Sequence, residues 1–117
     1  MGVVSGYSEG VRIERLIRDD MIANGYDVMR AAGSKGPADL ACFKPGQVAL
    51  ISVKRTTPPG PAERADLIRV AGYVAALPLG ALKPKGQPIA YRLLTGVGPA
   101  DWTLWTPDEL DPTGDAA

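Results

Sequence analysis

The sequence predicts an α/β fold in which a mixed sheet is flanked by helices, in the order α-β-β-β-α-β-β. Three observations support this prediction. An apolar stripe with helical spacing lies near the N-terminus, short alternating segments separated by Gly and Pro follow it, and a second helical segment comes after a proline-rich break. The chain of 117 residues, 45% of them hydrophobic, is long enough for a single packed core.

Composition narrows the classes of protein that the chain can belong to. Residues 1–110 are expected to form one domain, followed by an acidic tail at residues 111–117. The absence of His and the single Cys42 exclude a His-based nucleophile, a His-ligated zinc site and a disulfide framework. No apolar run approaches the roughly 20 residues of a membrane span. The N-terminus also lacks the pattern of a secretory signal, so we expect a cytoplasmic protein with no membrane partner.

Charge is distributed unevenly along a chain whose net charge is zero. Residues 1–100 carry all 13 basic residues and 8 acidic ones, a net charge of +5, whereas residues 101–117 carry 5 acidic residues and no basic one. A basic body is compatible with phosphate binding, although this pattern is not specific for it.

The first helix is predicted from Glu9 to Asn24. Its apolar residues recur mostly at spacings of three to five, and they are Val11, Ile13, Leu16, Ile17, Met21 and Ile22. Ser8 stands where an N-cap is expected, and Asn24-Gly25 supplies the end of the helix.

Three strands are predicted next, over residues 26–32, 38–43 and 48–54, because each segment is short and either alternating or apolar. "GSKGP" forms the loop after the first strand, and the four residues Lys44 to Gln47 form the turn between the second and third.

The second half of the chain is predicted to begin with a helix from about Ala62 to Ala76, with Pro61 in its first turn. Ala65, Ile68, Tyr73 or Gly72, and Ala76 would line one side of it. "PLGALKPKGQP" is predicted to be a loop, "IAYRLLTG" and "DWTLWT" two closing strands, and "TPDEL" a short helical turn.

The strand "VALISVK" carries the candidate chemistry. Ser52 and Lys54 share one face of it, whereas Ala49, Ile51 and Val53 form the apolar opposite face. A Lys at the end of a core strand is expected to have a charged partner or a functional role, because an unpaired charge is costly to bury.

The predicted hairpin suggests that partner. If Phe43 pairs with Val48, then Ala41 faces Leu50 and Asp39 faces Ser52. This register predicts that Asp39, Ser52 and Lys54 converge, with Asp39 as the partner of Lys54. A slip by one residue would separate them.

An Asp, a small polar residue and a Lys at one point are the components of a metal-dependent phosphodiesterase site. Mg²⁺ prefers hard oxygen ligands and can be held by one or two carboxylates, with Mn²⁺ as a substitute. A nearby ammonium group would orient the attacking water and stabilise the transition state. Glu14, at the border of the first helix's apolar stripe, is the best candidate for a second carboxylate.

The segment "EGVRIERLIRDDMIANGYDVMRAAGSKGPADLACFKPGQVALISVKRT" resembles the archaeal-type Holliday junction resolvases, a branch of the PD-(D/E)XK nuclease superfamily. The resemblance covers roughly residues 5–56, with a looser similarity in "ERADLIRVAGYVAALPLGAL". It is based on "IER" in the first helix, the strand ending in Arg30, the "AGSKG" loop, the Asp of "ADL", and the apolar strand ending in x-V-K.

This resemblance implies a restriction-endonuclease-like fold and a homodimer that nicks four-way DNA junctions symmetrically with Mg²⁺. Glu14, Asp39 and the Val53 carbonyl would bind the metal, and Lys54 would be the catalytic lysine. Ser34 matches a Ser needed for cleavage, and Arg30 matches a basic residue near the scissile phosphate. The expected DNA-binding residues are Arg12, Arg15, Arg30, Lys35 and Arg55.

Ser52 departs from the family, which has Glu at this position in an E-x-K motif. Because a hydroxyl adds no negative charge, either Asp39 and Glu14 sustain catalysis or the protein binds junctions and cuts them poorly. A nuclease of the same superfamily acting on flaps, mismatches or invading duplex DNA is a further alternative.

Plainer interpretations of the same residues remain open. Lys54 could be an exposed strand-end residue, Glu14 could form a salt bridge with Arg18 four residues later, and the scattered Arg residues could be an ordinary solvated surface.

Overall fold

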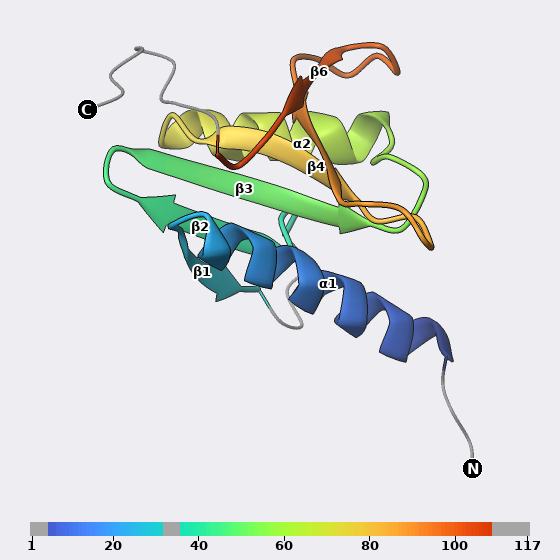
Figure 1. The fold of residues 1–117 in the computed structure, drawn as a ribbon. Helices are drawn as coiled ribbons and strands as arrows, with labels where there is room; N and C mark the ends of the chain where they lie inside the picture. The colour runs from blue at the N-terminus through green and yellow to red at the C-terminus, as the bar shows by residue number, and fades with distance from the viewer. Residues whose placement is uncertain (1–4, 32–35, 109–117) are drawn as a thin grey trace.

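The computed structural model describes residues 5–31 and 36–108. Two helices and six strands follow one another within these described residues (Figure 1). They are α1 (Ser5–Ala23), β1 (Asp27–Arg30), β2 (Leu40–Lys44), β3 (Gln47–Lys54), α2 (Pro61–Tyr73), β4 (Leu77–Leu82), β5 (Ala90–Leu94) and β6 (Trp102–Trp105). The predicted α/β fold with a mixed sheet and flanking helices is confirmed, with one strand more than expected.

The six strands form one sheet in the order of the sequence, β1-β2-β3-β4-β5-β6. Every neighbouring pair is antiparallel except β3 and β4, which are parallel and are connected through α2. In the described part of the chain, no helix has the length and hydropathy needed to cross a membrane.

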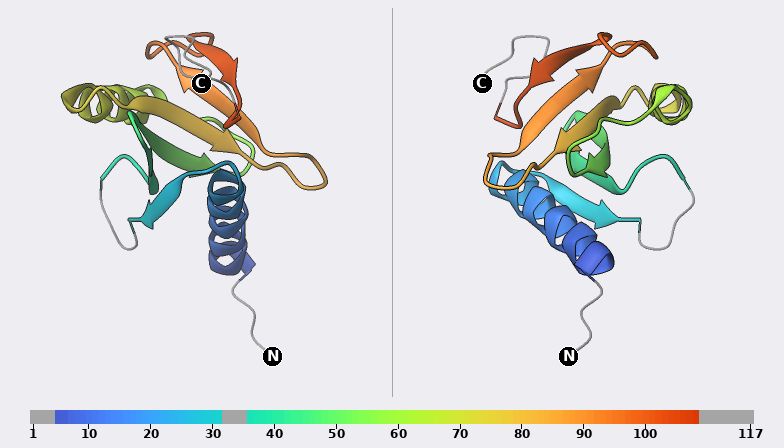
Figure 2. Two further views of the ribbon diagram at one scale, coloured as in Figure 1. Left: turned by 60° about the vertical axis from the view of Figure 1, so that its left-hand side comes forward. Right: turned by 90° about the vertical axis from the view of Figure 1, so that its right-hand side faces the viewer.

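Helix α1 covers one face of the sheet with the predicted apolar stripe (Figure 2). Ile13, Ile17 and Met21, spaced four residues apart, are almost completely buried. The helix ends at Ala23, and Gly25 follows it with a φ of 94°, the left-handed conformation that glycine adopts at low cost. It begins at Ser5, so the expected N-cap at Ser8 is wrong.

Helix α2 lies against the opposite face, but with a different side from the one predicted. Leu67 and Ala71 are buried, and Arg64 joins them in the same stripe. Tyr73, by contrast, is 69% exposed, so the predicted apolar side of this helix is wrong. The buried stripe of α2 was not recognised in the sequence because one of its members is charged. Arg64 can be buried there because its guanidinium donates to the carbonyl oxygens of Pro59 and Gly98 instead of to water.

Strand β4 occupies most of the first half of the segment that was predicted to be a loop. Its residues from Leu79 to Leu82 are buried because β4 is a central strand, paired with β3 on one side and β5 on the other. Pro78 and Gly80 suggested a loop, yet Gly80 has a packing role. A Cβ there would lie 3.5 Å from the ring of Pro59, which is ordinary van der Waals contact, so the loop before α2 packs directly on this position of the sheet.

The hairpin between β2 and β3 has the predicted register. Phe43 pairs with Val48 and Ala41 with Leu50, and the ladder continues to Lys44 and Gln47. The turn is therefore tighter than expected, since only Pro45 and Gly46 lie between the strands and Gly46 has a φ of 77°.

We expect Ile17→Ala to destabilise the fold by about 2–5 kcal/mol, because Ile17 is fully buried between α1 and the sheet. Urea denaturation would measure this loss. Ile22→Ala provides a control on the same helix, since Ile22 is 50% exposed and its truncation should cost much less. Equal losses for the two variants would contradict the packing described for α1.

Candidate active site

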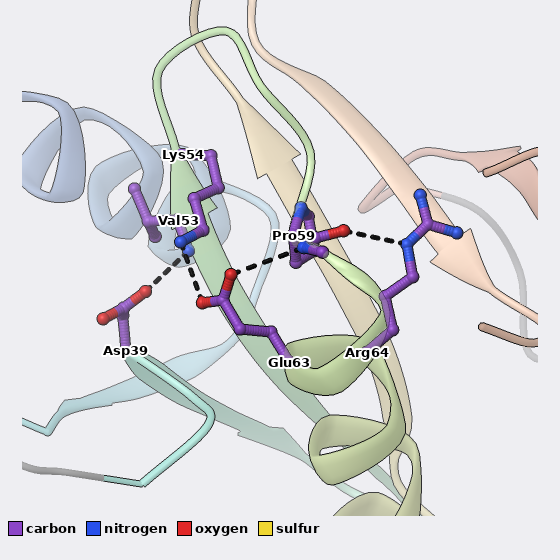
Figure 3. A network of polar contacts seen from close by, with 7 residues as sticks. Asp39, Val53, Lys54, Pro59, Glu63 and Arg64 are labelled. Carbon is purple, nitrogen blue, oxygen red and sulfur yellow. Dashed lines mark hydrogen bonds and ion pairs between the residues drawn. The ribbon is translucent and has the colours of Figure 1, made fainter. Parts of the chain in front are cut away.

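The candidate site lies where β3 ends and the chain turns toward α2. Asp39 stands directly before β2, Lys54 is the last residue of β3, and Glu63 belongs to the first turn of α2 (Figure 3). The three side chains come from separate elements that meet at this end of the sheet.

Asp39 is fixed by hydrogen bonds on both sides. Its backbone N–H donates to the Ile51 carbonyl at 2.8 Å, and its own carbonyl accepts from the Ala31 N–H at 2.9 Å. Its carboxylate oxygen Oδ2 accepts from the Val53 backbone N–H at 2.7 Å (Figure 3). Thus the carboxylate is held against the end of β3 by a hydrogen bond to its Oδ2 oxygen.

The surroundings of Asp39 disfavour its charged form. Burial is the main reason that its pKa is raised above the ordinary value, and the carboxylates of Glu14 and Glu63 raise it further. The Val53 N–H and the Lys54 ammonium act in the opposite direction. Acidic groups from α1 and α2 are therefore close enough to Asp39 to act on it electrostatically.

The predicted partnership between Lys54 and Asp39 is wrong in its direct form. The ammonium Nζ of Lys54 instead donates to Glu63 Oε2 at 2.9 Å, forming an ion pair (Figure 3). This hydrogen bond is the main reason that the pKa of Glu63 is lowered. Lys54 nevertheless remains near Asp39, since its charge lowers the pKa of that carboxyl.

Ser52 lies on the same face of β3 as Lys54, with Ala49 and Ile51 in the core on the other face, as predicted. It is 2% exposed, and its Cα partner in β4 is Gly80. The β2–β3 ladder stops at Leu40 and Ile51, one residue before the expected pair of Asp39 and Ser52. The Asp39 carboxylate accepts a hydrogen bond from the Val53 N–H. Ser52 is thus a buried residue beneath the site.

Glu14 reaches the site region from α1. Its carboxylate forms an ion pair with Nε of Arg30 at the end of β1, which brings two predicted site residues together. The alternative pairing of Glu14 with Arg18 is wrong, because Arg18 binds Asp19 at 3.0 Å. The charge of Glu14 raises the pKa of Asp39, so the two carboxylates influence one another.

The predicted basic residues have different outcomes. Arg12, Arg15 and Arg55 have exposed side chains, which suits contact with a large polyanion. Ser34 and Lys35 lie outside the described residues.

The resemblance implies a divalent metal ion, which requires oxygen ligands from the side chains and backbone of the site. Within residues 5–31 and 36–108, no three His, Cys, Asp or Glu side chains are grouped closely enough to form a ready-made metal site. The types of donor do fit Mg²⁺, which takes carboxylate and carbonyl oxygens and retains several waters.

Glu63 is a site residue that the sequence reasoning missed. A signal for it was present, since Pro61 was expected in the first turn of a helix that follows Lys54 after a short loop. A helix that starts so soon after a strand must begin near the strand's end. Its first-turn acid can then reach the last residue of the strand.

Comparison with known proteins bears on the fold. No protein-family model and no curated protein sequence matches the chain. Among solved structures, it is similar to Hjc from Archaeoglobus fulgidus, a Holliday junction resolvase from an archaeal hyperthermophile. The TM-score is 0.62 at 22% sequence identity, and the match covers 71% of this chain and 70% of the other. The chain therefore has the fold of this resolvase.

Asp39→Asn is expected to stabilise the protein at neutral pH. A raised carboxyl pKa contributes stability below the ordinary pKa of Asp, and this contribution is lost as the pH rises through the raised value. The Asn side chain stays neutral and keeps an oxygen for the Val53 N–H. Its melting temperature should exceed that of the wild type at pH 7 and approach it as the pH falls toward 4.

Asp66→Asn is the matched control, because Asp66 is an exposed acid on α2. A lower melting temperature for Asp39→Asn than for the wild type at pH 7 would contradict the electrostatic account of Asp39.

Proposed function

We propose that this chain is a structure-selective endodeoxyribonuclease that resolves four-way DNA junctions in the cytoplasm by paired, symmetric nicking. The observation that carries the proposal is the hydrogen bond of the Asp39 carboxylate to the Val53 N–H, which places this acid beside Lys54 at the end of β3 (Figure 3). The likeness to the fold of a Holliday junction resolvase supports the same substrate class.

In this proposal, Asp39 and Glu14 hold Mg²⁺ or Mn²⁺ together with the Val53 carbonyl. The Val53 N–H keeps one Asp39 oxygen in place, which leaves the other for the ion. When bound, the ion would lower the pKa of a coordinated water and offset charge on the phosphate.

Lys54 acts on the phosphate in this reaction. Its ammonium group orients the attacking water and neutralises negative charge that develops on the phosphate oxygens. Water attacks phosphorus, one ester P–O bond breaks, and the departing oxygen takes up a proton. No covalent enzyme intermediate is required.

DNA binding would depend on phosphate contacts from exposed basic residues, including Arg12, Arg15 and Arg55. Such contacts make affinity steeply dependent on salt and indifferent to sequence. Two cuts related by a two-fold axis require two identical sites, so the active species is a homodimer.

Asp39→Asn and Lys54→Ala should each reduce Mg²⁺-dependent nicking of a labelled mobile four-way junction by about 100-fold or more, because each removes a group that acts at the reacting phosphate. Junction binding in EDTA should remain largely intact. The measurement is a gel assay of nicked product with Mg²⁺ against an EDTA control.

Linear duplex, flap and mismatched duplex substrates in the same assay test the choice of substrate. Faster cleavage of one of these than of the junction would favour a related nuclease of different specificity. Normal cutting by both variants would show that the site is wrongly assigned.

Arg55→Ala should weaken junction binding at low salt and reduce the slope of log K against log salt by about 1, because one phosphate contact is lost. Lys44→Ala is the control. Lys44 lies over the ring of Tyr26 at the other end of the β2–β3 hairpin, about 23 Å from Lys54 along the strand. Fluorescence anisotropy over a salt series measures both slopes, and an unchanged slope for Arg55→Ala would remove it from the interface.

A further inference from the structure

Glu63 is an acidic side chain in the site to which the mechanism above gives no role. It stands in the first turn of α2, and its carboxylate reaches across to the end of β3 (Figure 3). Oε2 accepts from Lys54 at 2.9 Å, while Oε1 lies 3.4 Å from the backbone nitrogen of Gly60. With 52% of its side chain exposed, Glu63 is accessible to an ion arriving from solvent.

The strand itself supplies no acid on this face. Residue 52 projects from the same face of β3 as Lys54, two positions along the chain, but it is a Ser. A neutral hydroxyl that is 2% exposed cannot balance a divalent cation. The space next to Lys54 is taken instead by the carboxylate of Glu63.

We propose that Glu63 is the second acidic group of the site on this face of the sheet, and that with Asp39 it binds the divalent ion in place of an acid at position 52. The proposal rests on the nuclease function proposed above and assigns one of its ligands. In the arrangement described here, Lys54 neutralises Glu63. A dication held by Glu63 would take over that neutralisation and leave the ammonium for the phosphate.

The start of α2 is anchored firmly enough to position a ligand. The buried Arg64 donates from Nε to the Pro59 carbonyl at 3.0 Å and also binds the Gly98 carbonyl, which fixes the first turn to the β5–β6 loop. Pro59 in turn packs on Gly80 of β4. Glu63 therefore extends from a preorganised turn, and only its side-chain torsions need to change for it to bind an ion.

The contacts of the two carboxylates agree with this proposal. Asp39 accepts from the Val53 N–H and Glu63 accepts from Lys54, the next residue of β3, so both carboxylates lie at the same end of the strand (Figure 3). The ion pair between Lys54 and Glu63 is partly exposed, with 32% and 52% of the two side chains accessible. Such a pair contributes little to stability, so neutralising Glu63 should leave the fold intact.

The test compares Glu63→Gln, Ser52→Glu and the double variant, with Asp66→Asn as control. Asp66 is on the same helix and is 59% exposed, but it pairs with Arg69 and not with Lys54. Gln at position 63 keeps an oxygen for the Gly60 N–H, so the start of the helix is preserved. Mn²⁺ affinity by isothermal titration is the first readout, melting temperature in EDTA the second, and Mg²⁺-dependent junction nicking the third.

Glu63→Gln should lower Mn²⁺ affinity at least about tenfold and nicking about 100-fold, with little change in melting temperature in EDTA. Asp66→Asn should resemble the wild type. The double variant should recover most of the Mn²⁺ affinity, because an acid returns to the same face of β3. A purely structural role for Glu63 would not produce this recovery.

Wild-type Mn²⁺ affinity in Glu63→Gln, failure of the double variant to recover affinity, or no Mn²⁺ binding by the wild type would each overturn the proposal. The two hypotheses can fail separately. If Glu63 proves necessary for Mn²⁺ binding but the wild type cuts no junction, the ligand assignment stands and the proposed substrate fails. If the wild type cuts junctions and Glu63→Gln binds Mn²⁺ normally, the reverse holds.

Discussion

The parallel pairing of β3 with β4 is the constraint on which the site depends. Parallel neighbours cannot be joined by a tight turn, so the chain must leave the end of β3, cross one face of the sheet and return to the start of β4. Helix α2 makes this crossing, which places its first turn beside Lys54. The four antiparallel pairs of the sheet require no such crossing, whereas the β3–β4 connection brings a helix start to the site.

Charge balance follows from the same arrangement. Asp39 is partly buried, carboxylates from both helices act on it, and each of these acids has a basic partner from the sheet. Lys54 binds Glu63, and Arg30 binds Glu14. Each ion pair balances the charge of one helix carboxylate. Because both pairs are partly exposed, they can be rearranged at low cost when phosphate or metal replaces one partner.

The sequence was most informative where local pattern and tertiary environment agree. The stripe of Ile13, Ile17 and Met21 and the alternation in the β2–β3 hairpin predicted α1 and the register, because each depends on spacing within one segment. Strand β4 was missed because Pro78 and Gly80 are typical of loops, whereas the pairing of β4 with β3 and β5 exists only in the folded chain.

The true partner of Lys54 was missed for a similar reason. Register arguments identify neighbours across a hairpin, whereas Glu63 arrives from a helix whose position depends on a buried Arg64 and on carbonyls of distant loops. The buried face of α2 was equally hidden, since a charged residue in the stripe is readable only when its hydrogen-bond acceptors are known.

The proposed use of an acid at position 63 in place of one at position 52 also has a physical advantage. Position 52 is almost fully buried between neighbouring strands, so a carboxylate there would lose most of its hydration and would depend on metal or Lys54 for compensation. Glu63 is half exposed and is already paired with Lys54. An acid supplied from the start of α2 can therefore remain charged with or without a bound ion, and the strand beneath it can be packed tightly with small residues such as Ser52 and Gly80.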